Sequence, residues 1–145
     1  DVDGLKQVND ILGHASGDRL LTDLAEAWVL QLRREDLLAR VGGDEFVLLL
    51  TELKSRSRII EVMQGVLEMA RRPMDIDGKT IALSASAGVA IYPEIDLSAD
   101  ELLRFADQAM YRAKQQGAIA SSCSMPAKIW KAVNGRTNCW PCKAR

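Results

Sequence analysis

Two adjacent acids, Asp44 and Glu45, directly follow the pair Gly42-Gly43 and precede a run of apolar residues. Paired glycines can supply the positive φ angles that tight hairpin turns need, so the acids are expected at the mouth of a hairpin. They are either ordinary polar residues of a β-turn or carboxylates held out for a metal ion or a reacting hydroxyl group. Residue type and spacing leave both interpretations open.

Two further acids, Asp1 and Asp3, lie two positions apart, so on a strand both side chains would share one face unless the chain turns between them. If this strand neighbours the hairpin, three or four carboxylates meet at one end of a sheet, where their mutual repulsion favours a neutralising cation. Mg²⁺ suits such a set, because it takes oxygen ligands and commonly binds one or two carboxylates plus substrate phosphates. Solvated loop acids are the alternative interpretation.

Three polar residues near the N-terminus have types that suit a nucleotide. Lys6 follows Gly4 by two residues, in a turn where free backbone N–H groups could face a phosphate, or it is a solvated surface lysine. Asn9 and Asp18 could hydrogen-bond the edge of a base, since an acid that accepts from two N–H donors can read guanine. Each could equally be a cap or turn residue. His14 has no companion His or Cys nearby and is interpreted as a loop-packing residue.

The composition fits one domain with a hydrophobic core, because 48% of the 145 residues are apolar. With 19 basic and 20 acidic residues the net charge is −1, which gives no support to a broadly basic binder of a nucleic-acid polymer. No stretch approaches the roughly 18 apolar residues of a membrane span. All three cysteines follow residue 122, and a soluble, cytoplasmic location is expected. The start at Asp1, without a methionine, indicates a fragment of a longer protein.

Apolar periodicity and turn signals predict an α+β domain with a mainly antiparallel sheet. Ser16 is the expected N-cap of the first helix, and Asp77-Gly78 is a strong hairpin signal. After Gly117 no sustained period is present, and no structure is expected there. The expected elements are, in chain order, a strand end at Asp1–Gly4, a helix over Ser16–Arg34, a hairpin of Leu37–Val41 and Phe46–Leu50, a helix from Ile59 that ends near Pro73, a hairpin over Met74–Ile81, a strand over Leu83–Tyr92 and a helix over Ser98–Gln116.

Four segments together resemble the GGDEF-type diguanylate cyclases. In chain order they are DVDGLKQVNDILGHASGDRLL, ARVGGDEFVLLL, LSASAGVAIYP and ADQAMYRAKQQG, and the resemblance covers residues 1–117. One motif would be weak, but four in the right order with ordinary spacing are very specific. The resemblance implies a nucleotidyl-cyclase or ferredoxin-like α/β sandwich, with a central sheet flanked by helices. It also implies an enzyme that condenses two GTP molecules into cyclic di-GMP and releases two pyrophosphates.

The metal and catalytic residues follow from the same resemblance. Asp1, the Val2 carbonyl and Asp44 match the family's Mg²⁺ ligands, with Mn²⁺ as an alternative ion. Glu45 would complete the metal site or help to deprotonate the ribose 3′-hydroxyl, and its role is not separable from that of Asp44. Bound metal polarises a phosphate and lowers the pKa of an attacking hydroxyl, which suits attack on the α-phosphate.

The resemblance also gives eight residues to GTP. Asn9 and Asp18 correspond to the guanine-reading pair, and Lys6 and Lys114 match phosphate contacts. The other four contribute backbone or space: Gly4 and Leu5 would cradle the β- and γ-phosphates, while Gly42 and Gly43 would leave room for the nucleotide. Because each domain is expected to hold one GTP, a homodimer is required for catalysis.

Regulation is expected from residues next to the hairpin and from attached domains. Arg33 and Asp36 form an RxxD motif at the position of the family's product-inhibition site, where cyclic di-GMP would bind; a solvated charge cluster is the alternative. An upstream sensory domain, a downstream EAL phosphodiesterase domain and a membrane anchor in the parent protein are further expectations. A catalytically silent module that binds GTP or cyclic di-GMP is the alternative function, although the intact Gly42–Phe46 motif favours the enzyme.

The sequence departs from the family pattern at both ends and at Leu5, where the family more often has phenylalanine. The usual N-terminal helix and most of the first strand are missing, so this chain by itself is expected to be weak or inactive. Ala118 stands where a phosphate-binding arginine is expected. We hypothesise that 118–145 is an atypical tail read in a shifted frame, which leaves Cys139 and Cys142 without a metal or redox role.

Overall fold

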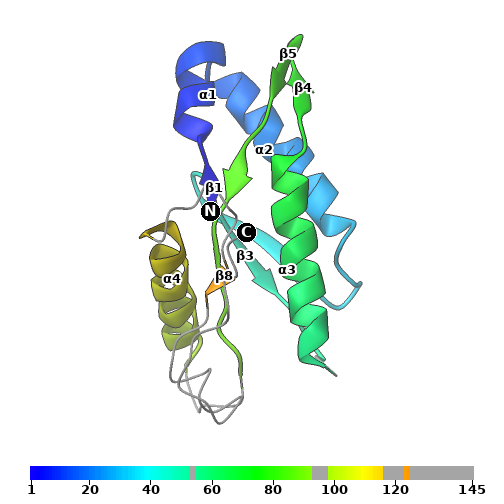
Figure 1. Cartoon of the computed structure of the whole chain (residues 1–145), viewed down its shortest axis with the longest axis vertical. Helices are drawn as coiled ribbons and strands as arrows, with labels where there is room; N and C mark the ends of the chain where they lie inside the picture. Colours follow the sequence, from blue (N-terminus) through cyan, green and yellow to red (C-terminus); the bar gives the residue numbers. More distant parts are fainter. Residues whose placement is uncertain (53–54, 93–97, 116–122, 125–145) are drawn as a thin grey trace. The chain divides into compact units, whose positions relative to one another are not determined.

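The computed structural model describes residues 1–52, 55–92, 98–115 and 123–124 (Figure 1). The chain divides into two compact units, Asp1–Ala85 and Ser86–Arg145. The first unit contains the helices α1 (Leu5–Leu12), α2 (His14–Val29) and α3 (Arg56–Arg71), and the strands β1 (Val2–Asp3), β2 (Leu37–Gly42), β3 (Glu45–Leu49), β4 (Met74–Ile76), β5 (Lys79–Ile81) and β6 (Ser84–Ala85). The second unit contains β7 (Ala87–Gly88), α4 (Ala99–Gln115) and β8 (Cys123–Ser124).

The strands of the first unit pair antiparallel, as β1 with β6, β2 with β3 and β4 with β5. In the second unit β7 and β8 run parallel, with Ala87 opposite Cys123. The α+β class with antiparallel strand pairs is confirmed. The strands of the described part form two-stranded ladders instead of one continuous central sheet. The strand predicted over Leu83–Tyr92 is correspondingly divided into the short β6 and β7.

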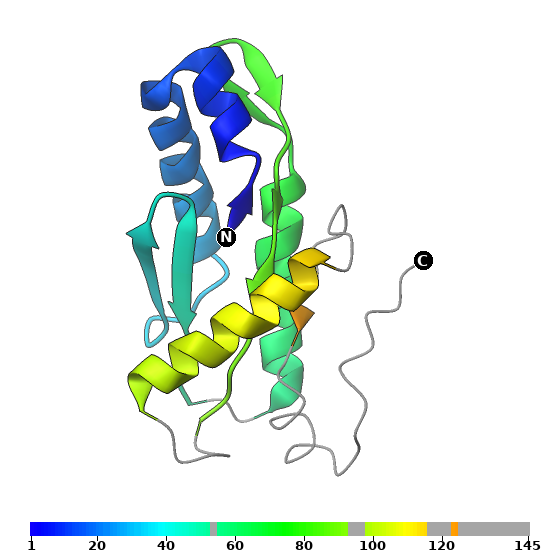
Figure 2. The same cartoon turned by 90° about the vertical axis from the view of Figure 1, so that its left-hand side faces the viewer.

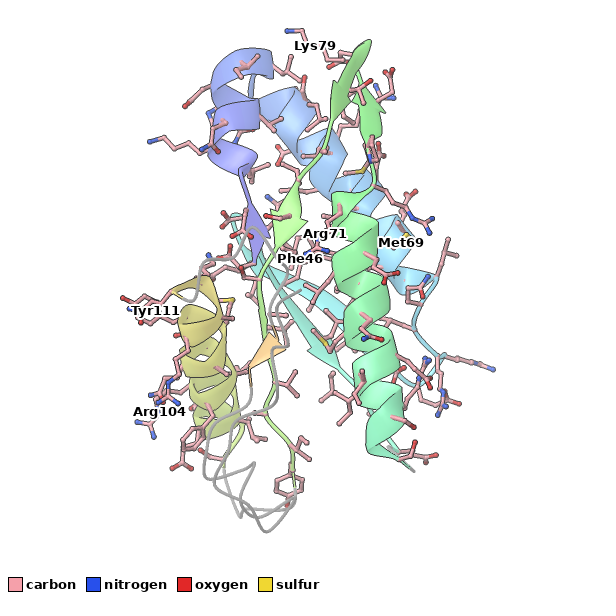
Figure 3. All side chains as sticks on the ribbon, in the orientation of Figure 1. Phe46, Met69, Arg71, Lys79, Arg104 and Tyr111 are labelled. Atoms are coloured by element: carbon pink, nitrogen blue, oxygen red, sulfur yellow. The ribbon has the colours of Figure 1, made fainter. Side chains whose placement is uncertain are left out.

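The core of the first unit lies between α2 and α3. Apolar residues three or four positions apart on α2 are almost fully buried: Leu20, Leu21, Leu24 and Trp28. The Trp28 indole N–H donates to the Val66 carbonyl of α3 at 2.8 Å, which satisfies the polar end of a buried ring. Phe46 of β3 is labelled in Figure 3. Its ring meets the Trp28 ring edge-on, with centroids 5.1 Å apart. One tryptophan therefore joins α2 to both α3 and the hairpin β2–β3.

The start of α2 differs from the sequence prediction. A separate helix, α1, occupies residues 5–12 and ends at Gly13, whose φ of 86° favours glycine. Helix α2 begins at His14 and ends at Val29, so the predicted N-cap at Ser16 and end at Arg34 are wrong. His14 is exposed in the first turn of α2, and its interpretation as a loop-packing residue is also wrong.

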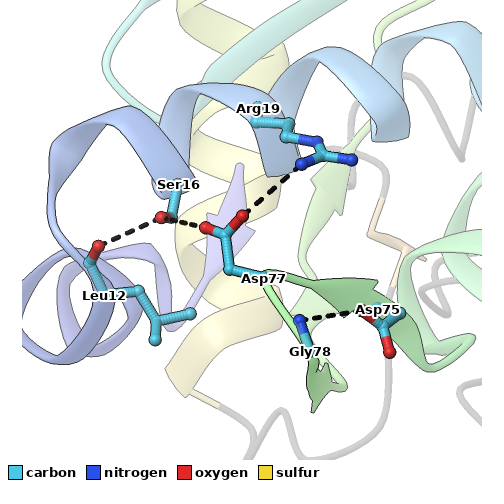
Figure 4. A network of polar contacts seen from close by, with 6 residues as sticks. All are labelled: Leu12, Ser16, Arg19, Asp75, Asp77 and Gly78. Carbon is cyan, nitrogen blue, oxygen red and sulfur yellow. Dashed lines mark hydrogen bonds and ion pairs between the residues drawn. The ribbon is translucent and has the colours of Figure 1, made fainter.

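Ser16 instead lies inside α2 and bonds to a distant hairpin. Its hydroxyl oxygen is 2.6 Å from the Asp77 carboxylate, 61 positions along the chain, and 3.0 Å from the Leu12 carbonyl (Figure 4). The single hydroxyl proton serves one acceptor at a time, and the short contact with the carboxylate is the stronger one. Arg19 also reaches Asp77, at 3.5 Å. The tip of β4–β5 is thus fastened to the first turns of α2.

The hairpin β4–β5 forms at Asp77-Gly78, as the sequence predicts. Both turn residues have positive φ, 54° at Asp77 and 75° at Gly78, which matches a type I′ turn. The Gly78 amide donates to the Asp75 carboxylate at 3.1 Å and closes the turn.

Helix α4 of the second unit begins with a capping box. The Ser98 amide and hydroxyl both donate to the Glu101 carboxylate, at 3.0 and 2.8 Å, and the Glu101 amide donates to the Ser98 hydroxyl at 3.3 Å. These bonds from Ser98 lower the pKa of Glu101 below its ordinary value of 4.5. Gly88 of β7 permits close packing, because a Cβ there would overlap the Ala106 carbonyl of α4.

Within the part of the chain that the structure describes, no helix is both long enough and apolar enough to cross a membrane.

Candidate functional site

Strand β1 lies beside the tip of the hairpin β2–β3 (Figure 2). The Val2 amide donates to the Asp44 carbonyl at 3.0 Å, and the Val2 side chain is fully buried. This backbone contact brings together two of the residues predicted to bind metal, from segments more than forty positions apart. The buried valine anchors β1 in the core, so the contact is held from behind by apolar packing.

The Gly42-Gly43 turn is built differently from the expectation. Neither glycine has φ in the left-handed region, and the register instead shifts between Arg40 and Gly42, where Gly42 pairs with Glu45. The expected reason for the two glycines, positive φ, is therefore wrong. A Cβ at Gly43 would meet nothing within 4 Å, and one at Gly42 would meet only the Glu45 carboxylate at 3.7 Å. The turn consequently leaves open space where the nucleotide was predicted.

The two acids of the turn have no internal partners among the described residues. Asp44 is half-buried and Glu45 is exposed, and neither carboxylate forms a hydrogen bond or ion pair with another described residue. Asp3 differs, because its carboxylate accepts a bond from the Ser84 hydroxyl at 3.0 Å. The acids at the tip are thus available to a ligand, whereas Asp3 is engaged with β6.

The predicted convergence of three or four carboxylates is not found. Among the described residues there is no group of three or more His, Cys, Asp or Glu side chains placed to hold a metal ion. Asp1, the Val2 carbonyl, Asp44 and Glu45 are nevertheless all oxygen donors, and they lie on two segments joined by the backbone bond from Val2 to Asp44. This set fits Mg²⁺, which takes one or two carboxylates and completes its shell with water and substrate phosphates.

The turn from β1 into α1 has the features of a phosphate-binding backbone. Gly4 has φ of 93°, a conformation that residues with a Cβ rarely adopt. Helix α1 starts directly after it, so the first amides of the helix have no partner within the helix. The Leu5 side chain is buried beneath this turn and Lys6 is exposed on it. Lys114 lies in the last turn of α4, in the second unit.

The predicted base-reading residues meet where α1 packs on α2. The Asn9 carboxamide of α1 lies against Gly17 of α2, and Asp18 follows Gly17 directly. The Asn9 Oδ1 atom is buried and has no hydrogen-bond partner in the described part of the chain. The structure therefore brings Asn9 and Asp18 together, although their helices are separated in sequence by the break at Gly13.

Arg40 joins this pair to the hairpin, and the sequence analysis missed it. Its Nε donates to the Gly43 carbonyl at 2.9 Å, and its Nη2 lies 3.4 Å from the Asp18 carboxylate. Both side chains of the Arg40–Asp18 pair are well exposed, so the pair adds little to stability. Its effect is geometric, since one guanidinium touches both the turn and the acid of α2. The sequence signal for this role was the position of Arg40, two residues before Gly42-Gly43.

The RxxD motif forms a closed turn. The Asp36 carboxylate accepts bonds from the Arg33 amide at 2.9 Å and from the Thr51 amide at 3.1 Å. The Asp36 amide in turn donates to the Arg33 carbonyl at 3.1 Å. Asp36 thus holds the loop before β2 against the end of β3, while the Arg33 side chain is exposed. The alternative of a fully solvated charge cluster does not describe Asp36.

Comparison with known proteins gives the class. The family described as "Diguanylate cyclase, GGDEF domain" matches residues 1–119 of this chain. The chain belongs to the GGDEF domain family, and its GGDEF residues are those at the tip of β2–β3.

Two of the similar proteins come from Pseudomonas aeruginosa. Diguanylate cyclase TpbB is 42% identical over 117 residues, which are 80% of this chain and 27% of TpbB. The bifunctional diguanylate cyclase/cyclic di-GMP phosphodiesterase MucR is 41% identical over 117 residues, 81% of this chain and 17% of MucR. A crystal structure of the GGDEF domain of PA1120 (YfiN or TpbB) has a TM-score of 0.78 at 40% identity, covering 85% of this chain and 77% of that one. The chain spans a minor part of the length of either relative.

Proposed function

We propose that the chain is the catalytic domain of a diguanylate cyclase, which condenses two GTP molecules into cyclic di-GMP and two pyrophosphates. The observation that carries the proposal is the contact between β1 and the hairpin tip. Because the Val2 amide bonds to the Asp44 carbonyl, the acids of the GGDEF motif stand next to the Asp1-Val2 backbone with carboxylates that no described residue occupies. The family membership and the cyclase name of TpbB support the same activity.

We assign the residue roles from the family resemblance, and the positions of the residues support the assignment. The amides at the start of α1 and the exposed Lys6 would bind the β- and γ-phosphates, and Asn9 with Asp18 would bind the guanine. Asp1, the Val2 carbonyl and Asp44 would hold Mg²⁺ or Mn²⁺, with Glu45 as a further ligand or as the acceptor of the 3′-hydroxyl proton. Magnesium, when bound, supplies Lewis acidity at the phosphate oxygens.

A second copy of the domain completes the reaction in this proposal. One bound GTP presents its ribose 3′-hydroxyl, and the α-phosphorus that it attacks belongs to the GTP of the facing copy. Two such attacks, each expelling pyrophosphate, close the ring of cyclic di-GMP. A sensory domain before this domain and an EAL domain after it, within the longer parent protein, would control how two copies meet. Arg33 and Asp36 are retained as the site at which the product inhibits the enzyme.

The test is product formation from GTP. The purified chain is incubated with GTP and Mg²⁺ at a series of protein concentrations, cyclic di-GMP is measured by mass spectrometry, and GTP binding is measured separately by equilibrium dialysis. The rate per chain should rise with protein concentration, because two domains must meet. Glu45→Gln should lower the rate by about 10²–10⁴-fold. Glu26→Gln, which changes an exposed glutamate on α2, is the matched control and should keep the rate.

The outcomes of this test distinguish a cyclase from a catalytically silent binding module. Formation of cyclic di-GMP that persists in Glu45→Gln contradicts the role of the acid pair. Binding of GTP without product at any protein concentration, both in this chain and in a longer chain that includes the expected N-terminal helix and first strand, contradicts the cyclase and supports a silent binding module. Absence of GTP binding contradicts both.

A further inference from the structure

Gly17 occupies a position in α2 where the backbone does not require glycine. Its φ lies outside the left-handed region, and glycine inside a helix costs about 1 kcal/mol relative to alanine. The residue is buried, and a Cβ there would overlap the Asn9 carboxamide oxygen. The same Cβ would lie 3.0 Å from Asn9 Cγ and 3.4 Å from Leu5 Cδ1. Glycine is therefore needed here for space, and the space is filled by Asn9.

The helix backbone at Gly17 is anchored on its other side. Ser16, the preceding residue, contacts the Asp77 carboxylate at 2.6 Å (Figure 4). The Gly17 amide donates to the Gly13 carbonyl at 3.3 Å. The Asn9 carboxamide, in contrast, is the end of a side chain that can rotate. A Cβ at Gly17 would consequently displace the carboxamide and leave α2 in place.

The position of the carboxamide decides which of its atoms a ligand can meet. Oδ1 of Asn9 is buried against Gly17 without a hydrogen-bond partner among the described residues, so Nδ2, a donor, is the end left for a ligand. Asp18, the next residue after Gly17, supplies an exposed acceptor. The guanine edge offers two adjacent N–H donors, N1–H and N2–H, beside the O6 acceptor. A carboxylate that accepts from both N–H groups next to an amide donor complements this edge, whereas adenine offers one donor beside one acceptor.

We propose that Gly17 is a positioning residue for base recognition: the absence of its Cβ holds the Asn9 donor beside the Asp18 acceptor and so sets the preference for guanine. This rests on the proposed function, in which Asn9 and Asp18 bind the base of GTP. Gly17 itself does not touch the nucleotide.

The test is Gly17→Ala in the full chain, with binding of GTP and of ATP measured by equilibrium dialysis. GTP binding should weaken by about 5–10-fold, the loss of one hydrogen bond, while the weaker ATP binding, which depends on the phosphate contacts, stays the same. The denaturant midpoint of unfolding should not fall, because alanine favours the helix. A purely structural role would lower the midpoint and leave the ratio of GTP to ATP affinity unchanged.

Gly65→Ala is the matched control. Gly65 lies in α3 of the same unit, and a Cβ there would be 2.9 Å from Gln31 Oε1, again the end of a side chain. This variant should displace Gln31 and keep the affinity for GTP. Equal losses of GTP affinity in the two variants would overturn the proposal.

A double-mutant cycle identifies the route of the effect. In an Asn9→Ala background the added Gly17→Ala should cause no further loss of GTP affinity, because no carboxamide remains to be displaced. The positioning role would be overturned if the double variant lost GTP affinity by the product of the two single losses. It would also be overturned if Gly17→Ala bound GTP as tightly as the unsubstituted chain. If the unsubstituted chain binds no GTP, the proposed function itself is overturned, and this result is distinct from a failure of the positioning role.

Discussion

The two hairpins of the first unit each carry glycine and aspartate at the turn, and they use them in opposite ways. In β4–β5 the Asp77 carboxylate contacts Ser16 and Arg19 of α2. In β2–β3 the Asp44 residue is held only through its backbone carbonyl, and its carboxylate has no partner among the described residues. The carboxylate of β4–β5 therefore contributes to the fold, whereas the carboxylates at the tip of β2–β3 are left without a partner among the described residues.

The turn glycines of the two hairpins also differ, in whether their backbone conformation requires glycine. Asp77 and Gly78 adopt positive φ, so the second position needs glycine for its conformation. Gly42 and Gly43 do not, and almost nothing would meet a Cβ on either. A glycine without a conformational reason beside acids without internal partners is therefore an indication of a binding surface. Changes at Trp28, Asp77, Asp44 and Glu101 test this comparison.

The largest effect on stability is expected behind the hairpin β2–β3, at Trp28. Trp28→Phe keeps an aromatic ring against Phe46 but removes the hydrogen bond from the indole to the Val66 carbonyl, which lies inside α3. The free energy of unfolding should fall by about 1–3 kcal/mol, from the lost hydrogen bond and the space left by the smaller ring, measured by urea denaturation. A change below about 0.5 kcal/mol would contradict the role given to the indole bond between α2 and α3.

Asp77→Asn tests the acid that serves the fold. Asparagine tolerates the left-handed conformation at this turn, so the variant removes the charge and keeps the hairpin. The free energy of unfolding should fall by about 1 kcal/mol, a value reduced because the Asp77 side chain is half exposed.

Asp44→Asn is the matched change on the other hairpin. It should alter the free energy of unfolding by less than about 0.5 kcal/mol, because no described residue depends on this carboxylate. Formation of cyclic di-GMP should fall much more in Asp44→Asn than in Asp77→Asn. A larger loss of stability in Asp44→Asn than in Asp77→Asn would reverse the comparison.

Sequence patterns predicted the elements whose burial follows a simple period. The apolar spacing on α2, α3 and α4 placed these helices within a few residues of their ends, and Asp77-Gly78 placed a hairpin. Helix α1 was missed because it is short and buries only Leu5 and Val8. Ser16 has the local signature of an N-cap, but its partner is 61 positions away, and no local pattern contains that information.

Sequence patterns predicted the candidate site only in part, for the same reason. The motif residues were identifiable by type and order, and the structure places Val2 at Asp44 and Asn9 near Asp18. Arg40 and Gly17 were missed, because each acts through a contact between elements. The position of Arg40 just before the glycine turn was a weak signal, and a glycine in a helix gives none until the facing side chain is known.

The last prediction concerns Glu101 at the start of α4, another acid that accepts hydrogen bonds from within the fold. Its pKa is lowered by the bonds from Ser98, so the charged form stabilises the helix start at pH values above 4.5. This contribution is lost as the pH falls through the lowered pKa of the folded chain. At about pH 6 the Glu101→Gln variant should therefore have a lower free energy of unfolding than the unsubstituted chain. The difference between the two free energies should be smaller at about pH 3. Urea denaturation at each pH measures both.

Ser98→Ala decides whether this dependence belongs to the capping box. It removes the hydroxyl that donates to Glu101 at 2.8 Å and accepts from the Glu101 amide at 3.3 Å. The double variant should then lose less than the sum of the two single variants, because both changes affect the bond between the Ser98 hydroxyl and the Glu101 carboxylate. Fully additive losses would mean that Glu101 acts through the Ser98 amide and the helix dipole and not through the hydroxyl. In that case Glu101 would differ from Asp77, whose donors are the side chains of Ser16 and Arg19.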